Sequence, residues 1–480
     1  MSIVSEERLF DVLAKYNPWW QHEFRTEMPV KRAAFHEIMR WLVHPPSQRG
    51  LLVTGARQIG KTTLLKQAIE ELLNQGVAGK SILYISYDNI FLKLTQMDDI
   101  INAFRKINSI SASDKIYILI DEIQHMDRWS LWLKTFLDME GGRVRLVATG
   151  STLGISMHQE ESGVGRWTTL RLATLSFYEF CLLSNRSVDI PSAIKSIKHL
   201  SVQDYHVLEH LKRQLGELES LFYEYLFRGG FPEMLRIEKL GDAQNLLRED
   251  IVSRVLKQDL TSVYGARNVL HIERLFLYLS LNPGSIVSPQ NVANELELKT
   301  SSLDTYLRYL LDANLLYRLS PVKPNGLPFI RGNYKYYLAD ASIHNALALE
   351  DKSVLKNSAW TGSLVETVVF KHIFTWSYRA QPEFGYVRDS KTKREVDILV
   401  RFPDSRLVPF EVKYRNQLRP KDHVSLTHFI EQNKLPYGYL ITRDTETLGQ
   451  VINERIQCVP AHIFCYILGY LELGDAEVGK

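Results

Sequence analysis

A chain of 480 residues is too long to fold around one hydrophobic core, so we expect roughly two to four domains. Its 45% apolar and 24% charged residues match ordinary globular proteins and exclude an intrinsically disordered chain. The formal net charge of +3 neither supports nor excludes a nucleic-acid partner, because any basic surface on so long a chain would have to be local.

The first part of the chain alternates short apolar runs with helical stretches. Residues 1–45 predict a helical lead-in, interrupted at Asn17-Pro18-Trp19-Trp20. The apolar runs that follow are mostly continuous, which is typical of strands buried on both faces of a parallel sheet. They predict a doubly wound α/β domain over residues 46–182, with strands at residues 51–53, 81–85, 116–120 and 144–148.

The rest of the chain predicts three further domains. Residues 183–265 have helical spacing, broken at Arg228-Gly229-Gly230-Phe231-Pro232, and predict a helical lid. Residues 266–350 follow a helix-turn-helix-like pattern and predict a winged helix. Residues 351–480 return to a mixed α/β pattern. The expected elements are helices at residues 287–296 and 303–313, a wing strand at 315–319, and later strands at 395–400, 407–412 and 437–442.

A glycine-rich loop follows the first predicted strand and leads into a helix-forming segment. Its glycines allow a turn in which successive backbone N–H groups face a phosphate, and the helix dipole adds to the attraction. Lys61 would reach the β- and γ-phosphates of ATP, and the Thr62 hydroxyl would ligate Mg²⁺. A chance glycine-rich turn would lack the strand before it and the helix after it. The predicted ATP-binding residues are Gly55, Ala56, Arg57, Gln58, Ile59, Gly60, Lys61, Thr62 and Thr63.

Polar residues end the next two predicted strands. Asp121 would hold the Mg²⁺ shell and Glu122 would polarise the attacking water, although an acidic pair in this place is often only solvated. Thr149 would orient the water or sense the γ-phosphate, unless it belongs to a simple turn. Arg166, expected in a surface loop, is either a solvated charge or an arginine finger supplied in trans by a neighbouring subunit. The finger would require self-association.

These motifs together resemble a large prokaryotic family of AAA+-type ATPases. The order Gly-x-Arg-Gln-x-Gly-Lys-Thr-Thr, Asp-Glu-Ile-Gln, Ala-Thr-Gly-Ser, Gly-Arg and Leu-Ser-Phe-x-Glu-Phe carries the resemblance. The Asn-Pro-Trp-Trp lead-in and the Gly-Gly-Phe-Pro-Glu element match it as well. The resemblance implies an AAA+ fold, followed by a winged-helix segment and a carboxyl-terminal domain of uncertain function. It also implies that Arg228 and the glycines after it lie in the lid near the nucleotide.

Charged residues converge on two predicted carboxyl-terminal strands. Glu411 and Lys413 share one face of a strand, and Asp397 lies on its neighbour. Glu366, on a predicted helix, could complete a set that holds a divalent cation and places a lysine beside an attacking water. The order resembles the PD-(D/E)xK nuclease core, which implies Glu366, Asp397 and Glu411 as metal ligands and Lys413 as a catalytic residue. The alternative is an exposed cross-strand ion pair, or a relative that has lost activity.

The second helix of the predicted winged helix carries residue types that contact DNA. They are Lys299, Thr300, Ser301, Ser302, Thr305 and Arg308, with Lys323, Arg331 and Lys335 as candidate wing contacts. Because this helix is not strongly basic, it could equally serve only for packing. Two functions stay open: an ATPase coupled to a nuclease that acts on DNA, or an ATP-driven switch that binds protein or nucleic acid without cleaving it.

The amino terminus, the apolar runs and the cysteines indicate where the protein is located and the redox state of its thiols. The amino terminus has no basic region followed by an apolar stretch, and no apolar run reaches the ~18 residues of a membrane span. The 3 cysteines lack metal-ligand spacing and are expected as free thiols. We therefore expect a cytoplasmic protein with no membrane partner.

Overall fold

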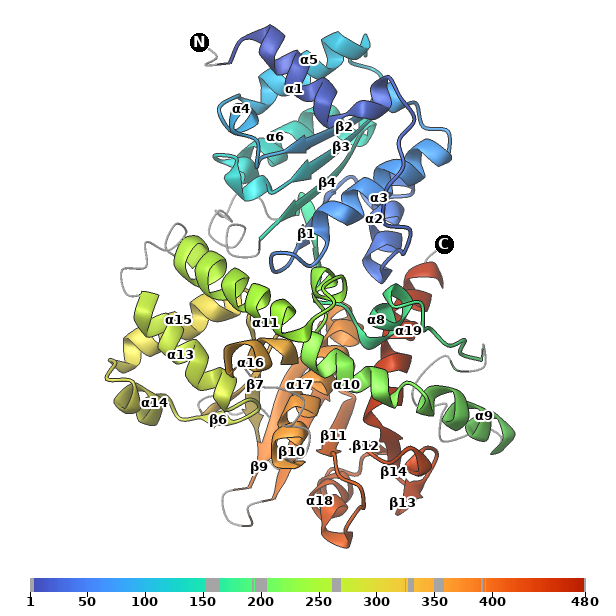
Figure 1. The fold of residues 1–480 in the computed structure, drawn as a ribbon, viewed down its shortest axis with the longest axis vertical. Helices are drawn as coiled ribbons and strands as arrows, with labels where there is room; N and C mark the ends of the chain where they lie inside the picture. Colours follow the sequence, from blue (N-terminus) through green and yellow to red (C-terminus); the bar gives the residue numbers. More distant parts are fainter. Residues whose placement is uncertain are drawn as a thin grey trace. The chain divides into compact units, whose positions relative to one another are not determined.

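The chain divides into two compact units (Figure 1). The computed structural model describes residues 4–151, 165–191, 194, 205–260, 269–323, 325–326, 332–348, 358–389, 392 and 394–478. The first unit ends at Leu172 and also takes in the residues after Glu472, and the second runs from Ala173 to Glu472.

The first unit is built on a parallel sheet with the strand order β2-β3-β4-β1-β5. Its strands are β1 (Gly50–Thr54), β2 (Ile82–Ser86), β3 (Ile116–Asp121), β4 (Val144–Gly150) and β5 (Trp167–Arg171). The four predicted strands are confirmed, and their residues are almost entirely buried, as in a sheet covered on both faces. The sequence did not predict β5, because only one residue of this edge strand, Leu170, is buried, and the strand lacks a continuous apolar run.

Helices flank this sheet (Figure 1). They are α1 (Glu6–Tyr16), α2 (Ala33–Val43), α3 (Lys61–Asn74), α4 (Ile90–Lys93), α5 (Met97–Asn108) and α6 (Trp129–Glu140). In α5, acidic residues occupy the first turn and basic residues the last, which complements the helix dipole. Its buried apolar residues lie on one face, so both the ends and the face of this helix follow from the sequence.

The Asn-Pro-Trp-Trp segment covers the free edge of β2. The Asn17 side chain both accepts a hydrogen bond from the Tyr84 N–H at 2.6 Å and donates to the Tyr84 carbonyl at 3.0 Å. The indole N–H groups of Trp19 and Trp20 donate to the Ile82 carbonyl. These bonds satisfy backbone groups that an edge strand otherwise leaves open for pairing with another chain.

The second unit is built on a mixed sheet with the strand order β13-β14-β12-β11-β10-β9-β7-β8-β6. Parallel pairing of β7 with β9 joins the hairpin of the expected winged helix to the strands of the expected nuclease-like domain. The predicted boundary at residue 350 therefore falls inside one continuous sheet. The strands are β6 (Ile286–Val287), β7 (Leu316–Val322), β8 (Tyr334–Leu338), β9 (Glu383–Arg388), β10 (Glu395–Arg401), β11 (Leu407–Lys413), β12 (Gly438–Thr442), β13 (Val451–Ile452) and β14 (Ile456–Pro460).

Helices of this unit include those expected at residues 183–265 and 287–313. They are α8 (Phe177–Leu183), α9 (Tyr205–Gly216), α10 (Glu219–Arg228), α11 (Leu240–Glu249), the π-helix η8 (Asp250–Asp259), α13 (Val269–Leu281), α14 (Pro289–Glu295), α15 (Thr300–Asp312), α16 (Ala341–Ala348), α17 (Ser358–Ser377), α18 (Val424–Gln432) and α19 (Ala461–Val478), which belongs to this unit as far as Glu472. Helix α8 belongs to this unit rather than to the predicted ATPase core that ended at residue 182. Ser176 and Glu179 form a capping box at its start, which gives the Leu-Ser-Phe-x-Glu-Phe motif a structural role.

A buried ion pair explains why glycine occupies position 230 in the Arg228-Gly229-Gly230-Phe231-Pro232 segment. Lys371 on α17 donates to Asp340 at 3.0 Å and also to Thr174 and to the Leu175 carbonyl. The N–H of Gly230 donates to the same Asp340 carboxylate at 3.0 Å. A Cβ atom at position 230 would lie 2.5 Å from the Leu175 carbonyl oxygen, so only glycine lets the two backbones approach.

Candidate functional sites

The phosphate loop lies between β1 and α3, at the carboxyl edge of the first sheet. Gly60 has φ 92°, a left-handed conformation in the turn that leads directly into the helix. Ile59 is fully buried and anchors the loop, while residues 56–58 are half-buried. Arg32, which the sequence did not single out, donates to the Ile59 carbonyl at 2.8 Å. Residues 55–63 therefore form one strand–loop–helix connection, with Thr63 in the first turn of α3.

Lys61 is 4% exposed and its ammonium lies inside the loop. It donates to the carbonyls of Gly55 at 3.2 Å and Ala56 at 2.8 Å. Glu122 lies 3.9 Å from the same ammonium. A lysine held in this way is positioned to meet a phosphate placed against the loop.

Asp121, at the end of β3, is the centre of the polar network. Its carboxylate accepts hydrogen bonds from Thr62 at 2.6 Å, from Tyr84 at 3.1 Å and from Thr149. Thr149 is on β4, the strand between β1 and β3, and is fully buried. The contact of Tyr84 with Asp121 could not be predicted from the sequence, because a tyrosine inside an apolar strand gives no sign of its partner.

Glu122 begins the turn after β3 in a left-handed conformation, with φ 56°. Its N–H donates to the Thr149 hydroxyl at 3.3 Å, and its carboxylate accepts from the Gln124 side chain. The Gln124 carbonyl oxygen in turn accepts from the Ser151 N–H at 3.2 Å. Gln124, the last residue of the Asp-Glu-Ile-Gln motif, thus links the ends of β3 and β4 and orients Glu122.

Two side chains at the loop offer oxygen ligands for a small, hard metal cation. Thr62 supplies a hydroxyl and Asp121 a carboxylate, and they already contact each other. Mg²⁺ prefers such oxygen ligands together with phosphate oxygens. The residues present therefore fit Mg²⁺ bound together with a nucleotide.

The two arginines expected near the nucleotide have other partners. Arg166 precedes β5, and its carbonyl accepts from Gly50 at the start of β1, the edge opposite the phosphate loop. Its guanidinium pairs with Asp138 at 2.6 Å. Arg228 pairs with Glu224 and donates to the backbone carbonyls of residues 234, 237 and 238, so it stabilises the end of α10. Arg166 therefore does not join the phosphate loop of its own chain.

The predicted carboxyl-terminal residues come together around β10 and β11, which pair antiparallel. Asp397 accepts from the N–H of Val412 at 2.9 Å and lies 3.9 Å from the Lys413 ammonium. Lys413 also donates to Glu411 on its own strand. The contacts of Lys413 with these carboxylates are not an exposed cross-strand ion pair, since Asp397 and Glu411 are only 7% and 3% exposed.

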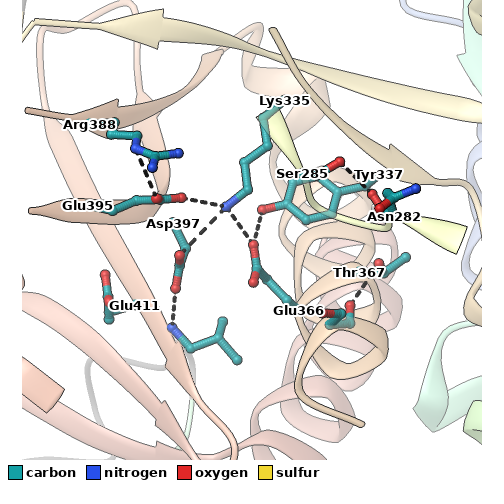
Figure 2. Close-up of polar contacts among 12 residues, drawn as sticks. Asn282, Ser285, Lys335, Tyr337, Glu366, Thr367, Arg388, Glu395, Asp397 and Glu411 are labelled. Atoms are coloured by element: carbon teal, nitrogen blue, oxygen red, sulfur yellow. Dashed lines mark hydrogen bonds and ion pairs between the residues drawn. The ribbon is translucent and has the colours of Figure 1, made fainter. Parts of the chain in front are cut away.

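Lys335 joins this cluster from β8 (Figure 2). Its ammonium lies 2.7 Å from Glu366, 3.3 Å from Glu395 and 3.6 Å from Asp397. Lys335 is 1% exposed, so its expected role as a wing contact with DNA is wrong. Arg331, the other basic residue of that wing, lies outside the described residues, whereas Lys323 is exposed.

Burial and charge shift the pKa values in this cluster. Burial, and then the Asp397 carboxylate, raise the pKa of Glu411 well above its usual range. Burial also raises the pKa of Glu366, against the opposing effect of Lys335. Burial alone would lower the pKa of Lys335, but the Glu366 carboxylate and its neighbours raise it instead. Lys335 therefore stays positively charged.

The fit of this cluster to a metal ion is partial. Within the described residues, no group of three or more His, Cys, Asp or Glu side chains is arranged to hold a metal. The expected third ligand, Glu366, is occupied by Lys335 and by the Tyr337 hydroxyl. One buried oxygen, Oε2 of Glu411, has no hydrogen-bond partner. Asp397 and Glu411 are thus the carboxylates that fit a divalent cation.

The polar helix expected to contact DNA is α15. Leu303, Leu307 and Leu310 form its buried face. Ser301 and Arg308 are exposed, together with the acidic Asp304. Thr300 bonds Gln290 of α14, so part of the polar set serves the contact between the two helices.

Three family models match successive parts of the chain. Residues 47–181 match an AAA domain, residues 219–354 a Domain of unknown function (DUF8612), and residues 361–464 a Domain of unknown function (DUF4143). The phosphate loop, the Asp121–Glu122 pair and the first match together define an AAA-type ATPase domain in this chain.

Two relatives match most of the chain, and each is described only as an uncharacterized protein. A protein of Haemophilus influenzae is 24% identical over 370 residues, covering 75% of this chain and 82% of the relative. One of Methanocaldococcus jannaschii is 24% identical over 406 residues, covering 84% and 82%.

Solved structures that match include the replication initiator DnaA. The AMPPCP-bound DnaA of Aquifex aeolicus is 14% identical, covering 58% of this chain and 88% of that one, with a TM-score of 0.23. DnaA bound to AMPPCP and single-stranded DNA is also 14% identical, covering 57% and 86%, with a TM-score of 0.24. TM-scores this low do not establish a shared fold.

Among the helices that the structure describes, none combines the length and the apolar character needed to cross a membrane.

Proposed function

We propose that this protein hydrolyses ATP at the phosphate loop and uses its nucleotide state to control a nuclease-like domain that acts on DNA. The observation that carries the first half is the convergence of Lys61, Thr62 and Glu122 on one sheet edge. Lys61 would leave the carbonyls of its own loop and meet the β- and γ-phosphates. Glu122, held by Gln124, would orient the attacking water and accept its proton.

Mg²⁺ held by Thr62 and Asp121 would offset the negative charge of the phosphates. Thr149 would act through Asp121, since its hydroxyl is bonded to that carboxylate. An arginine to stabilise the transferred phosphoryl group would come from Arg166 of another copy. This arrangement requires self-association, which a mass measurement with and without ATP would detect.

Phosphate release by the purified chain tests the ATPase proposal. We expect Lys61→Ala to lower turnover by a factor on the order of 10² or more. Lys66→Ala is the control, because this exposed lysine lies on the same helix away from the loop. Unchanged hydrolysis in Lys61→Ala would reject the assignment.

The proposed nuclease-like site consists of Asp397, Glu411 and Lys413. A divalent cation held by the two carboxylates would activate a water and polarise a phosphodiester. Lys413, beside both carboxylates, would hold that water and neutralise charge that develops on the phosphate. The exposed positions of α15, Ser301 and Arg308, would contact the DNA backbone if this segment acts as a winged helix.

A second candidate function is an ATP-driven switch whose nuclease-like domain binds without cleaving. The observation that favours it is Lys335, because its ammonium already neutralises Glu366. Incubation with single-stranded, double-stranded and branched DNA, with Mg²⁺ or Mn²⁺ and with or without ATP, separates the two candidates. Cleavage that is lost in Lys413→Ala supports the nuclease, whereas binding without cleavage in both proteins supports the switch.

A further inference from the structure

The carboxylate cluster of the second unit offers two places for a positive charge. One is between Glu366 and Asp397, where the Lys335 ammonium lies 2.7 Å and 3.6 Å from the two side chains. The other is beside Glu411, whose buried Oε2 has no hydrogen-bond partner. We infer that Lys335 permanently fills the first place, so that the site takes a single divalent cation, held by Asp397 and Glu411. This inference rests on the proposed metal site and specifies how many ions it holds.

Lys335 is fixed where it lies. It is the second residue of β8, and the strand is paired at this position with β7 on one side and with β6 on the other. Tyr337, two residues along and therefore on the same face of the strand, donates its hydroxyl to the same Glu366 carboxylate. Only 1% of the surface of Lys335 is exposed, so its side chain is enclosed within the cluster.

The second place, beside Glu411, is not filled by a lysine ammonium. Lys413 binds Oε1 of Glu411 and leaves Oε2 without a donor in a residue that is 3% exposed. A buried carboxylate oxygen without a partner is costly, and a cation would supply the missing contact. Asp397 lies beside Glu411, as Figure 2 shows, and provides the second carboxylate.

The balance of charge agrees with one further cation. Glu395 is paired at the rim with Arg388, at 3.9 Å. The three remaining carboxylates, Glu366, Asp397 and Glu411, face only the ammonium groups of Lys335 and Lys413. With all three carboxylates ionised, the two ammonium groups leave one negative charge uncompensated. One divalent cation more than offsets that charge, so no negative charge is left in the cluster to attract a second ion.

The number of Mn²⁺ ions bound by the full chain, measured by electron paramagnetic resonance of free Mn²⁺, tests this inference. The number of ions bound by Asp397→Asn is subtracted from the number bound by each other protein. Because Asp397→Asn keeps the phosphate loop, the difference counts only the ions held at the carboxylate cluster. We expect a difference of one ion for the parent chain and of two for Lys335→Ala, because the alanine vacates the first place. Lys421→Ala, an exposed lysine of the same unit, is the control and should match the parent chain.

A difference of two in the parent chain would overturn the inference, and so would an unchanged count in folded Lys335→Ala. A difference of zero in the parent chain would reject the metal site itself, and the inference with it. If Lys335→Ala is unfolded without metal, its circular dichroism is followed during Mn²⁺ titration. Refolding by Mn²⁺ would support the inference, whereas a variant that stays unfolded would overturn it.

Discussion

The hydroxyl of Thr62 donates to the Asp121 carboxylate at 2.6 Å, although 59 positions separate the two residues in the chain. This contact joins the start of α3 to the end of β3 across the strand that carries Thr149. It holds both expected magnesium ligands at one point of the sheet edge. Glu122 follows directly, so that the residue proposed to activate water lies beside the residue proposed to hold the cation.

Glu122→Gln should separate ATP binding from hydrolysis. The amide retains the size of the side chain but cannot accept a proton, so we expect turnover to fall by about 10²–10⁴-fold while nucleotide binding persists. Fluorescent-nucleotide binding and phosphate release measure the two properties. Asp99→Asn, an exposed substitution on α5, should change neither. Hydrolysis at the parent rate in Glu122→Gln would show that another group serves as the base.

Asn17→Ala should destabilise the first unit. The substitution removes both hydrogen bonds to the Tyr84 backbone and leaves a buried N–H and carbonyl without partners, at a cost of about 1–3 kcal/mol. Urea unfolding followed by circular dichroism measures the loss. Gln21→Ala replaces a nearby exposed amide and serves as the control. Equal unfolding midpoints for the two variants would contradict the edge-covering role of Asn17.

Gly230→Ala should destabilise the second unit, because the new Cβ atom would lie 2.5 Å from the Leu175 carbonyl oxygen. We expect a loss of about 1–3 kcal/mol from the forced backbone shift. Gly241→Ala adds the same methyl group where no atom lies within 4 Å, and should be close to neutral. Thermal melts of both variants test the difference. A neutral Gly230→Ala would show that the Asp340–Lys371 contact tolerates displacement.

Glu411 should make stability depend on pH. Burial and Asp397 raise its pKa well above 4.5, so the folded chain holds a proton that the unfolded chain releases. The free energy of unfolding should therefore fall as the pH rises from that ordinary value through the raised pKa, by ~1.4 kcal/mol for each unit of the shift. Glu411→Gln should make this decrease in the free energy of unfolding smaller. It should not abolish the decrease, because the pKa of Glu366 is raised as well.

Urea unfolding in metal-free buffer across this pH range measures the effect. Glu431→Gln, an exposed substitution on α18, should leave the pH dependence as it is in the parent chain. Stability that instead rises with pH would show that Glu411 is ionised in the folded chain at ordinary carboxyl pH.

Local sequence predicted most of the sheet of the first unit and its phosphate loop. Continuous apolar runs predicted β1 to β4, and the phosphate loop followed from its position between a strand and a helix. Parallel strands end at the same edge of a sheet, so the meeting of Asp121 with Thr62 was also implied by the order of the elements. The exposed edge strand β5 was missed, because its few buried residues leave no periodic signal.

The second unit depended on contacts that no local pattern records. The sequence by itself determined the strands that carry Asp397, Glu411 and Lys413, because alternation along a strand sets which side chains share a face. Only the tertiary structure decided that β7 pairs with β9 and that Lys335 enters the carboxylate cluster. The reason is physical: a lysine in a strand is normally solvated, and only the three carboxylates gathered around Lys335 from α17 and β10 make its burial favourable.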